Sequence, residues 1–326
     1  MTIPSPFKIG SVTIDPPLIL APMAGVSHSP FRRLVASFAR PGLFFSEMLS
    51  ARHLPNDVRK NSVWLQRGEV EHPMAYQIVA PNPEEAVIGA RELAGYGAEI
   101  IDLNLAYPAP NIAGKRKAGG HLLSDLALIE KILTALRPAI SCPLTVKIRL
   151  GVAPDLAFLK DLVGVLETTG VDAVTLHPRL TSEKLRGKAR WEYIGQLKSM
   201  TRLPVIGNGD VTSREDCLAM FLQTGCDGVM IGRAAVQKPW LFAEVLGEKQ
   251  EINADFLWAT YQEAWRLIGE FYPEHQALGR VKEFTWYFSK NLRFGHNLAA
   301  RMQSLPDLAT CREFAELEFL RCCGFD

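Results

Sequence analysis

Residues 204–233 read PVIGNGDVTSREDCLAMFLQTGCDGVMIGR and contain one complete structural repeat of the chain. Two short apolar runs, Pro204–Gly209 and Gly228–Arg233, flank a segment in which a helix is expected to begin near Ser213. Runs that are apolar throughout are typical of parallel strands, because helices cover both faces of a parallel sheet. The segment therefore predicts a strand, a helix and a second, parallel strand.

The same alternation extends from residue 17 to about residue 247. The expected helices include Pro83–Gly95, with Asn82 as its N-cap, and Ser124–Arg137. Eight such units in some 230 residues fit a closed (β/α)8 barrel better than an open doubly wound sheet. The predicted fold class is therefore α/β, a TIM barrel. Its eight expected strands are Leu18–Pro22, Leu43–Glu47, Ala75–Val79, Ile100–Leu105, Leu144–Arg149, Ala173–His177, Pro204–Gly209 and Gly228–Arg233.

A different pattern begins after about residue 250, where glycine-flanked apolar runs no longer occur. Residues 254–272, 276–290 and 306–322 carry apolar side chains at three- and four-residue spacing, which predicts amphipathic helices. We therefore expect a barrel domain over residues 1–247 and a small helical domain over residues 248–326. No low-complexity linker separates them, so the two are expected to pack together.

Composition excludes several classes of protein. The chain has 36 Lys and Arg residues against 35 Asp and Glu, which argues against a strongly basic nucleic-acid wrapper and an acidic disordered protein. No apolar run approaches the roughly 20 residues of a membrane span, and no leader pattern opens the chain. None of the six cysteines has CxxC spacing, so neither a zinc site nor a disulfide framework is indicated. A cytoplasmic protein with no membrane partner is expected.

Polar residues and glycines gather where the expected strands end. In a TIM barrel the loops after the strands build the active site. Lys147 and Arg149 alternate along one strand, so both are expected to point into the barrel mouth. The residues singled out in this way are Pro22, Met23, Gln77, Asn104, Lys147, Arg149, His177, Arg179, Asn208, Gly209, Asp210, Gly232 and Arg233.

Two glycine loops predict a phosphate site. Gly209 and Gly232 let backbone N–H groups approach an anion, and helices are expected to begin just after both loops. Arg233 adds a charged donor. The chain lacks the dinucleotide fingerprint GxGxxG, so a mononucleotide cofactor is indicated, with FMN as the best candidate. The alternative is that both glycines only form ordinary strand-to-helix turns.

Lys147 suits such a cofactor, since a fixed cation stabilises the negative charge that an electron-accepting ring gains on reduction. Gln77 and Asn104 are expected to supply donors and acceptors to the edge of a heterocycle. The alternative for Lys147 is a structural ion pair with Glu47 or Asp102.

Together these motifs resemble the bacterial tRNA-dihydrouridine synthase family. The matching segments run in order through the barrel, and residues 280–288 resemble the family's helical tail. The resemblance implies an FMN-bearing barrel, a helical domain that helps to bind tRNA, and NADPH-dependent reduction of the uracil C5=C6 bond. The segments are LILAPMAGVSHSPFR (18–32), FFSEM (44–48), AYQIV (75–79), IIDLNLAYP (100–108), LTVKIR (144–149), VTLHPR (174–179), PVIGNGDV (204–211), VMIGRAAVQKPWLF (229–242) and RVKEFTWYF (280–288).

The resemblance also implies roles for individual residues. Asn104 would face both flavin and uracil, and hydride would pass to uracil C6 while a general acid protonates C5. The residues expected to contact the flavin are Pro22, Met23, Gln77, Lys147, His177, Asn208, Gly209, Asp210, Gly232 and Arg233.

The chain departs from the family at the proton donor. The family motif is Asp-x-Asn-x-Gly-Cys-Pro, and its cysteine is the acid, whereas residues 102–108 read DLNLAYP. Tyr107 thus stands where the thiol is expected. It is predicted to be catalytic or to contact substrate, because a phenol can also donate a proton. Two alternatives remain: a changed substrate, as for an FMN ene-reductase acting on a small conjugated carbonyl compound, or a packing role in a catalytically silent RNA-binding paralogue.

Basic residues near the barrel mouth predict RNA contacts. One cluster lies within Arg179–Arg190 and a second on the loop after the fourth strand, so positive potential at the mouth could attract a phosphate backbone. The helical tail is net acidic, with eight Lys and Arg against eleven Asp and Glu in residues 251–326. The expected substrate contacts are Asn104, Lys115, Arg116, Lys117, Arg149, Arg179, Arg186, Arg280 and Lys282.

Overall fold

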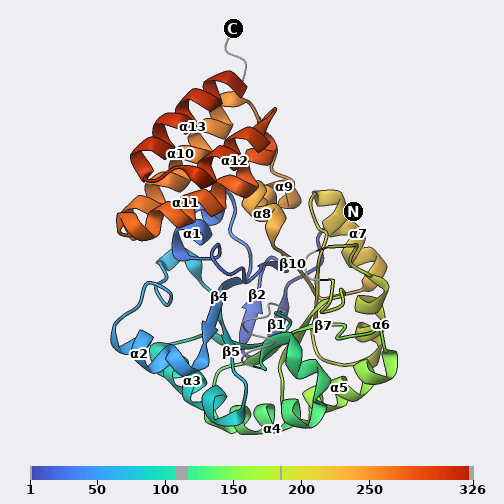
Figure 1. The fold of residues 1–326 in the computed structure, drawn as a ribbon. Helices are drawn as coiled ribbons and strands as arrows, with labels where there is room; N and C mark the ends of the chain where they lie inside the picture. Colours follow the sequence, from blue (N-terminus) through green and yellow to red (C-terminus); the bar gives the residue numbers. More distant parts are fainter. Residues whose placement is uncertain (1, 108–116, 184–185, 323–326) are drawn as a thin grey trace.

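The computed structural model describes residues 2–107, 117–183 and 186–322. Eight parallel strands form one sheet in the order β3-β10-β9-β8-β7-β6-β5-β4. A parallel bridge between Ile19 and Leu43 joins the first strand to the last, so the sheet closes into a barrel (Figure 1). The predicted fold class is confirmed. The strands are β3 (Leu18–Leu20), β4 (Phe44–Ser50), β5 (Met74–Val79), β6 (Ile100–Leu105), β7 (Leu144–Arg149), β8 (Ala173–His177), β9 (Val205–Asn208) and β10 (Gly228–Ile231).

The barrel helices begin where side-chain caps are available. Asn82 accepts a hydrogen bond from the Glu85 amide and opens α3, as its sequence indicates. α4 starts two residues later than expected, because Asp125 is its N-cap. The helices of this region are α1 (Ser29–Phe38), α2 (Leu54–Arg59), α3 (Pro83–Tyr96), α4 (Leu126–Leu136), α5 (Leu156–Thr168), α6 (Glu192–Met200), α7 (Arg214–Thr224), α8 (Arg233–Gln237) and α9 (Leu241–Leu246).

A short hairpin precedes the barrel and was not predicted. β1 (Phe7–Ile9) and β2 (Val12–Ile14) pair antiparallel. Ile9 and Ile14 are fully buried in a cluster with Ile19, Ile100 and other side chains at the amino ends of the barrel strands. The hairpin therefore covers the end of the barrel opposite the expected site. Strands of three residues are too short to give a recognisable alternation.

Four α-helices form the described part of the second region, residues 248–322, where three were expected. They are α10 (Ala254–Phe271), α11 (Glu274–Phe288), α12 (Gly295–Ser304) and α13 (Leu308–Cys322). The buried ring of Tyr261 packs against Phe284, Phe288 and Phe319 and forms the centre of this core. α12 has only ten residues and is largely polar, so few apolar positions mark it in the sequence.

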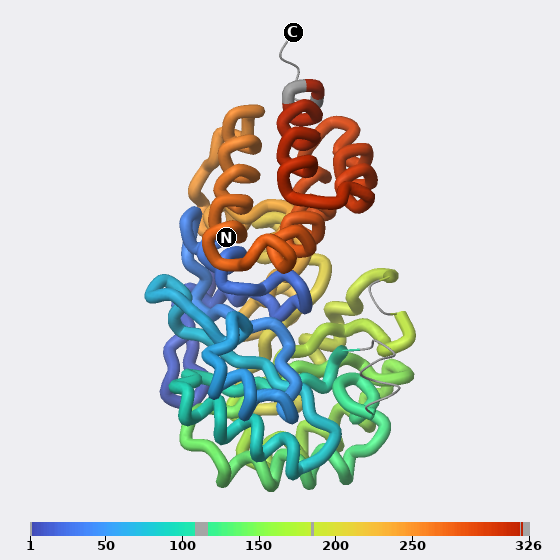
Figure 2. Tube along the Cα trace, turned by 60° about the vertical axis from the view of Figure 1, so that its left-hand side comes forward, coloured from blue at the N-terminus to red at the C-terminus, as the bar shows by residue number. Residues whose placement is uncertain are grey.

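This helical region stands on one side of the barrel, over α1, α8 and α9 (Figures 1 and 2). The expected domain boundary at residues 247 and 248 falls between α9 and α10. Among the described residues, no helix has the length and apolar character required to cross a lipid bilayer.

Candidate functional site

A cavity of about 640 Å³ opens at the carboxyl ends of the barrel strands. All ten residues expected to contact a flavin line it, together with Asn104, Tyr107, Arg149 and Arg179. The wall also includes residues outside the set of expected contacts. Met48 follows the expected strand end on β4, and Glu283, Tyr287 and Lys290 come from α11. The helical region thus contributes part of the cavity wall.

Lys147 lies on the cavity floor and is 7% exposed. Its Nζ donates to Asn208 Oδ1 over 3.0 Å, and Asn208 Nδ2 donates to the Met230 carbonyl oxygen over 2.8 Å. Burial and the positive charge of Arg149 lower the pKa of Lys147 to about 7. None of the ion pairs among the described residues includes Lys147. The side chain is therefore held by an amide, and no ion pair among the described residues competes with a ligand for it.

A buried chain of hydrogen bonds fixes two amide side chains on the same floor. Gln77 Nε2 donates to Asp102 Oδ2 over 2.8 Å, and Asn104 Nδ2 donates to Gln77 Oε1 over 2.7 Å. The other Asp102 oxygen accepts from the Thr145 hydroxyl over 2.6 Å. Burial raises the pKa of Asp102 to about 6. Asp102 thus anchors the chain and orients both amides.

This orientation decides what the amides offer a ligand. Asn104 Oδ1 accepts from the backbone N–H groups of Ala106 and Tyr107, over 2.9 and 2.8 Å. Its acceptor capacity is therefore used within the protein, while one hydrogen on each amide nitrogen remains. The sequence predicts that Gln77 and Asn104 offer a ligand both donors and acceptors, whereas the structure favours donors. A ligand rich in acceptor atoms fits this floor.

His177 is neutral for a physical reason. Its Nε2 accepts from Arg179 Nη1 over 2.8 Å, since a guanidinium only donates. Burial and the nearby charges of Lys147 and Arg149 hold the pKa of His177 well below its usual range. The remaining ring nitrogen then carries the proton.

Arg179 lines the cavity but has partners within the chain. Its side chain is 2% exposed, so it is not part of an exposed basic cluster. It forms an ion pair with Asp210, whose second carboxylate oxygen accepts from the Ala189 amide over 2.7 Å. Asp210 lines the cavity, but its carboxylate shapes the loop from within. The ion pair therefore fixes the shape of the loop that forms this part of the cavity wall.

Gly209 is required by the shape of its loop. Its φ is +118°, and an added Cβ would lie 2.9 Å from both Ala189 Cβ and His177 Cδ2. Trp191 Nε1 donates to the Gly209 carbonyl oxygen over 2.9 Å and holds the loop in place. Gly232 and Arg233 follow β10 in the same wall. The two glycine loops predicted from the sequence thus meet at one end of the cavity.

Tyr107 is half-buried at the cavity edge. Its amide donates to Asn104 Oδ1, and its carbonyl oxygen accepts from the Gly120 amide over 3.0 Å. The backbone on both sides of the ring is thereby fixed. Lys115 and Arg116 lie outside the described residues, whereas Lys117 is described and exposed.

Comparison with known proteins identifies the family of the chain. Residues 19–316 match the family model described as Dihydrouridine synthase (Dus). The chain belongs to the dihydrouridine synthase family. It is 37% identical to tRNA-dihydrouridine synthase B of Pseudomonas putida over 242 residues, which cover 74% of this chain and 71% of that protein. It is 35% identical to tRNA-dihydrouridine synthase B of Pasteurella multocida, covering 75% and 74% respectively.

Solved structures with the same fold include two other oxidoreductases. Morphinone reductase in complex with tetrahydroNAD aligns with a TM-score of 0.55 at 12% identity, over 77% of this chain and 92% of that chain. A 6-hydroxypseudooxynicotine amine oxidase from Pseudomonas geniculata aligns with a TM-score of 0.57 at 14% identity, over 74% of this chain and 49% of that chain. At these identities the likeness concerns the barrel fold.

The basic residues near the barrel mouth and in the helical region differ in availability. Arg186 and Lys188 are exposed near the mouth, whereas Arg190 pairs with Glu183 at 2.5 Å. Lys282 was expected to contact substrate, but its Nζ donates to the carbonyl oxygens of Gln303 and Leu305, which end α12. That side chain is therefore used to cap a helix.

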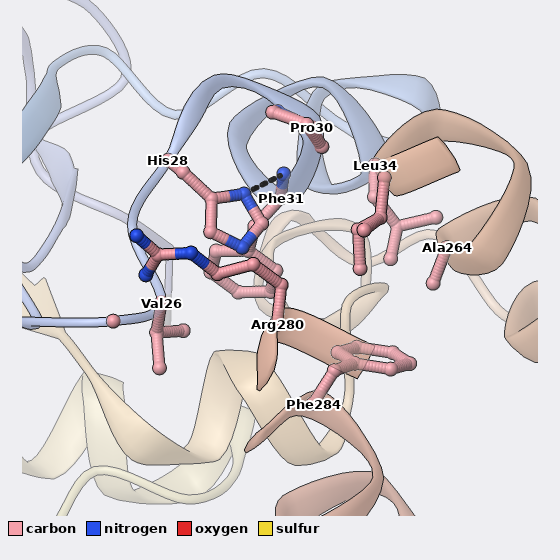
Figure 3. Close-up of a pocket in the computed structure, with 10 residues that line it drawn as sticks. Val26, His28, Pro30, Phe31, Leu34, Ala264, Arg280 and Phe284 are labelled. Atoms are coloured by element: carbon pink, nitrogen blue, oxygen red, sulfur yellow. Dashed lines mark hydrogen bonds between the residues drawn. The ribbon is translucent and has the colours of Figure 1, made fainter. Parts of the chain in front are cut away.

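Arg280 also has partners within the chain. Its guanidinium lies in a small second cavity between α1, α10 and α11 (Figure 3). Nη1 approaches Glu47 Oε1 at 3.4 Å. The side chain is only 13% exposed and lies between the barrel and the helical region, so the expected contact of Arg280 with substrate stays a prediction.

Proposed function

We propose that the protein reduces the C5=C6 bond of a uridine in tRNA, with FMN bound in the large cavity, NADPH as the reductant and the cytoplasm as its place of action. The observation that supports this most is the composition of the cavity wall in a member of the dihydrouridine synthase family. Cations and amide donors gather at one floor, beside two glycine loops. A planar cofactor with acceptor atoms and a terminal phosphate suits this arrangement.

The residues present fit FMN in kind and in position. Lys147 and Gln77 would meet the ring with donor groups, because Lys147 Nζ and the second Gln77 amide hydrogen lie on the cavity floor. Gly209, Gly232 and Arg233 would receive the phosphate, because they lie in the cavity wall on the loops that follow the neighbouring strands β9 and β10. Bound FMN supplies hydride chemistry, which no side chain of the protein can provide.

Residues of the chain would then orient the uracil base and donate a proton to it. Asn104 holds the Tyr107 backbone and retains an amide hydrogen for a uracil carbonyl oxygen. Lys147 places positive charge at the floor, where negative charge that develops during reduction is stabilised. Tyr107 is the candidate donor of a proton to uracil C5, since its side chain borders the cavity.

The same Tyr107 favours one alternative. A phenol occupies more space than a thiol, so a tyrosine at this edge also suits a small conjugated carbonyl substrate in an ene-reductase. The remaining possibility is a catalytically silent paralogue that binds both flavin and RNA. Binding of tRNA separates the ene-reductase from the other two functions, and formation of dihydrouridine in tRNA separates those two from each other.

The deciding experiment has two parts. The purified protein should carry a flavin absorption spectrum, and FMN should be the chromophore released on denaturation. Nucleoside mass spectrometry should show less dihydrouridine in tRNA from cells that lack the protein, restored by the wild-type gene but not by a Lys147→Met variant. Unchanged dihydrouridine with a flavin spectrum would favour an alternative substrate, and absence of FMN binding would refute the cofactor assignment.

A further inference from the structure

Arg280 connects the two regions of the molecule. It lies on α11, in the helical region, and its guanidinium reaches the barrel loop that contains Gly25, Val26 and His28 (Figure 3). An added Cβ on Gly25 would lie 3.7 Å from Arg280 Nη1. The guanidinium thus covers the backbone of this loop closely.

Three side chains surround the guanidinium. Glu47 Oε1, on β4, is 3.4 Å from Nη1. The ring of Trp64 is 4.7 Å from the guanidinium carbon and that of Tyr272 is 5.4 Å from it. A carboxylate and two aromatic rings hold a planar cation in one orientation. Such a site uses the cation internally and leaves little of it for a macromolecular partner.

Glu47 also contacts the loop that lines the cofactor cavity, through its second carboxylate oxygen. Its second oxygen, Oε2, accepts from the Gly25 amide over 2.5 Å. Gly25 has φ +82°, and its neighbours Met23, Ala24 and Val26 line the large cavity. Val26 lines both cavities and therefore forms part of the wall between them. One carboxylate thus joins a residue of the helical region to the loop after β3.

The electrostatics make this connection depend on Arg280. Glu47 is 6% exposed, and its Oε1 has no hydrogen-bond partner among the described residues. Burial raises the pKa of Glu47, while the positive charge of Arg280 opposes this shift. Removing Arg280 would leave a buried carboxylate without its nearest counter-charge, which is strongly unfavourable.

We infer that Arg280 is a positioning residue, which holds the loop Pro22–Val26 in its cofactor-binding shape through Glu47 and so couples the helical region to the flavin site. This role rests on the proposed flavin site. The helical region then contributes to cofactor binding through a defined contact, in addition to the part of the cavity wall that α11 supplies.

Arg280→Met tests the inference, with Arg293→Met as a matched control. Arg293 is an exposed arginine of the same region, whose guanidinium lies 5.1 Å from the ring of its neighbour Phe294. In the cofactor-free protein, amide hydrogen exchange at residues 25–27 should accelerate in Arg280→Met alone. The dissociation constant for FMN, from flavin fluorescence, should rise roughly tenfold in the same variant, as a lost positioning contact predicts.

Glu47→Gln supplies the second arm and should fold, since a glutamine oxygen can still accept from the Gly25 amide. The double variant, Arg280→Met with Glu47→Gln, should bind FMN no more weakly than Arg280→Met alone, because it contains no buried, unpaired Glu47 carboxylate. If Arg280→Met leaves loop exchange and FMN affinity unchanged but weakens tRNA binding, Arg280 is an RNA contact and the inference is wrong. Should the wild-type protein bind no FMN, the proposed function fails, while loop exchange still tests the connection.

Discussion

Lys147 Nζ donates to Asn208 Oδ1 over 3.0 Å and thereby links β7 to β9 across the floor of the large cavity. Asn208 in turn donates to the Met230 carbonyl oxygen of β10. An amide holds a lysine in place without neutralising it, whereas a carboxylate would form an ion pair. The cation is therefore positioned before any ligand arrives, which lowers the cost of binding an acceptor-rich group.

The first prediction concerns this cation. Lys147→Met should weaken FMN binding by about ten- to a hundredfold, because a buried charge-assisted hydrogen bond is lost. Fluorescence titration of the cofactor-free protein measures the effect. Lys160→Met is the control, since Lys160 is exposed on α5 and lies outside the cavity. Equal affinity in all three proteins would remove Lys147 from the cofactor site.

The second prediction is a pH dependence with a definite sign. Burial and Arg149 lower the pKa of Lys147 to about 7 in the free protein, so the side chain loses its proton as the pH rises through that value. A hydrogen-bond acceptor beside Lys147 favours its charged form, and FMN binding above about pH 7 should therefore take up a proton and weaken with rising pH. The second ionisation of a phosphate, near pH 6, affects binding only at lower pH.

Calorimetry in two buffers of different ionisation enthalpy measures the proton uptake. Between pH 7 and 9 the wild-type affinity should fall, and Lys147→Met should show a nearly flat profile. A wild-type profile that matches the variant over this range would contradict the assignment. Arg149 does not interfere, because burial and Arg179 lower its pKa only to about 10.

The third prediction concerns Gly209. Gly209→Ala places a Cβ 2.9 Å from His177 Cδ2 in a backbone conformation that alanine rarely adopts. It should lower the free energy of unfolding by about 1–3 kcal/mol and abolish FMN binding. Gly164→Ala is the control, because its Cβ meets nothing within 4 Å on α5. That variant should gain roughly 0.5–1 kcal/mol. Thermal unfolding of the two variants separates strain from a general effect of alanine.

Much of the barrel was predictable because most strands are short, largely apolar runs in which polar residues or glycines occur at or just after the carboxyl end. The parallel topology then placed Lys147, Asn208 and Gly209 together without further information. The β1–β2 hairpin was not predicted, because each of its strands has only three residues. Helix α12 was not predicted, because it has few apolar positions.

Side-chain partners were harder to predict than placement. Arg280 and Lys282 look like available cations in the sequence, yet one faces Glu47 and the other caps α12. Such partners come from elements distant in sequence, and local composition carries no trace of them. Tyr287 is a similar case, since only the packing of α11 against the barrel brings it to the cavity wall.

The fourth prediction concerns RNA. Arg186 is exposed near the barrel mouth. Arg186→Gln should weaken tRNA binding and reduce the slope of log affinity against log salt by about one, as loss of a single phosphate contact predicts. Arg91→Gln, an exposed arginine on α3, should leave the slope unchanged. Filter binding from low to moderate salt measures both, and identical slopes in the two variants would exclude Arg186 from the interface.

The last prediction decides the role of Tyr107. Its backbone is fixed by Asn104 and Gly120, so Tyr107→Phe should keep the ring in place and remove only the hydroxyl. If that hydroxyl protonates uracil C5, dihydrouridine formation should fall by about a hundredfold or more with FMN affinity unchanged, as expected for a lost general acid. Tyr193→Phe, away from the cavity, is the control. Full activity of Tyr107→Phe would show that another group donates the proton, and activity confined to Tyr107→Cys would show that the native chain has lost the reaction.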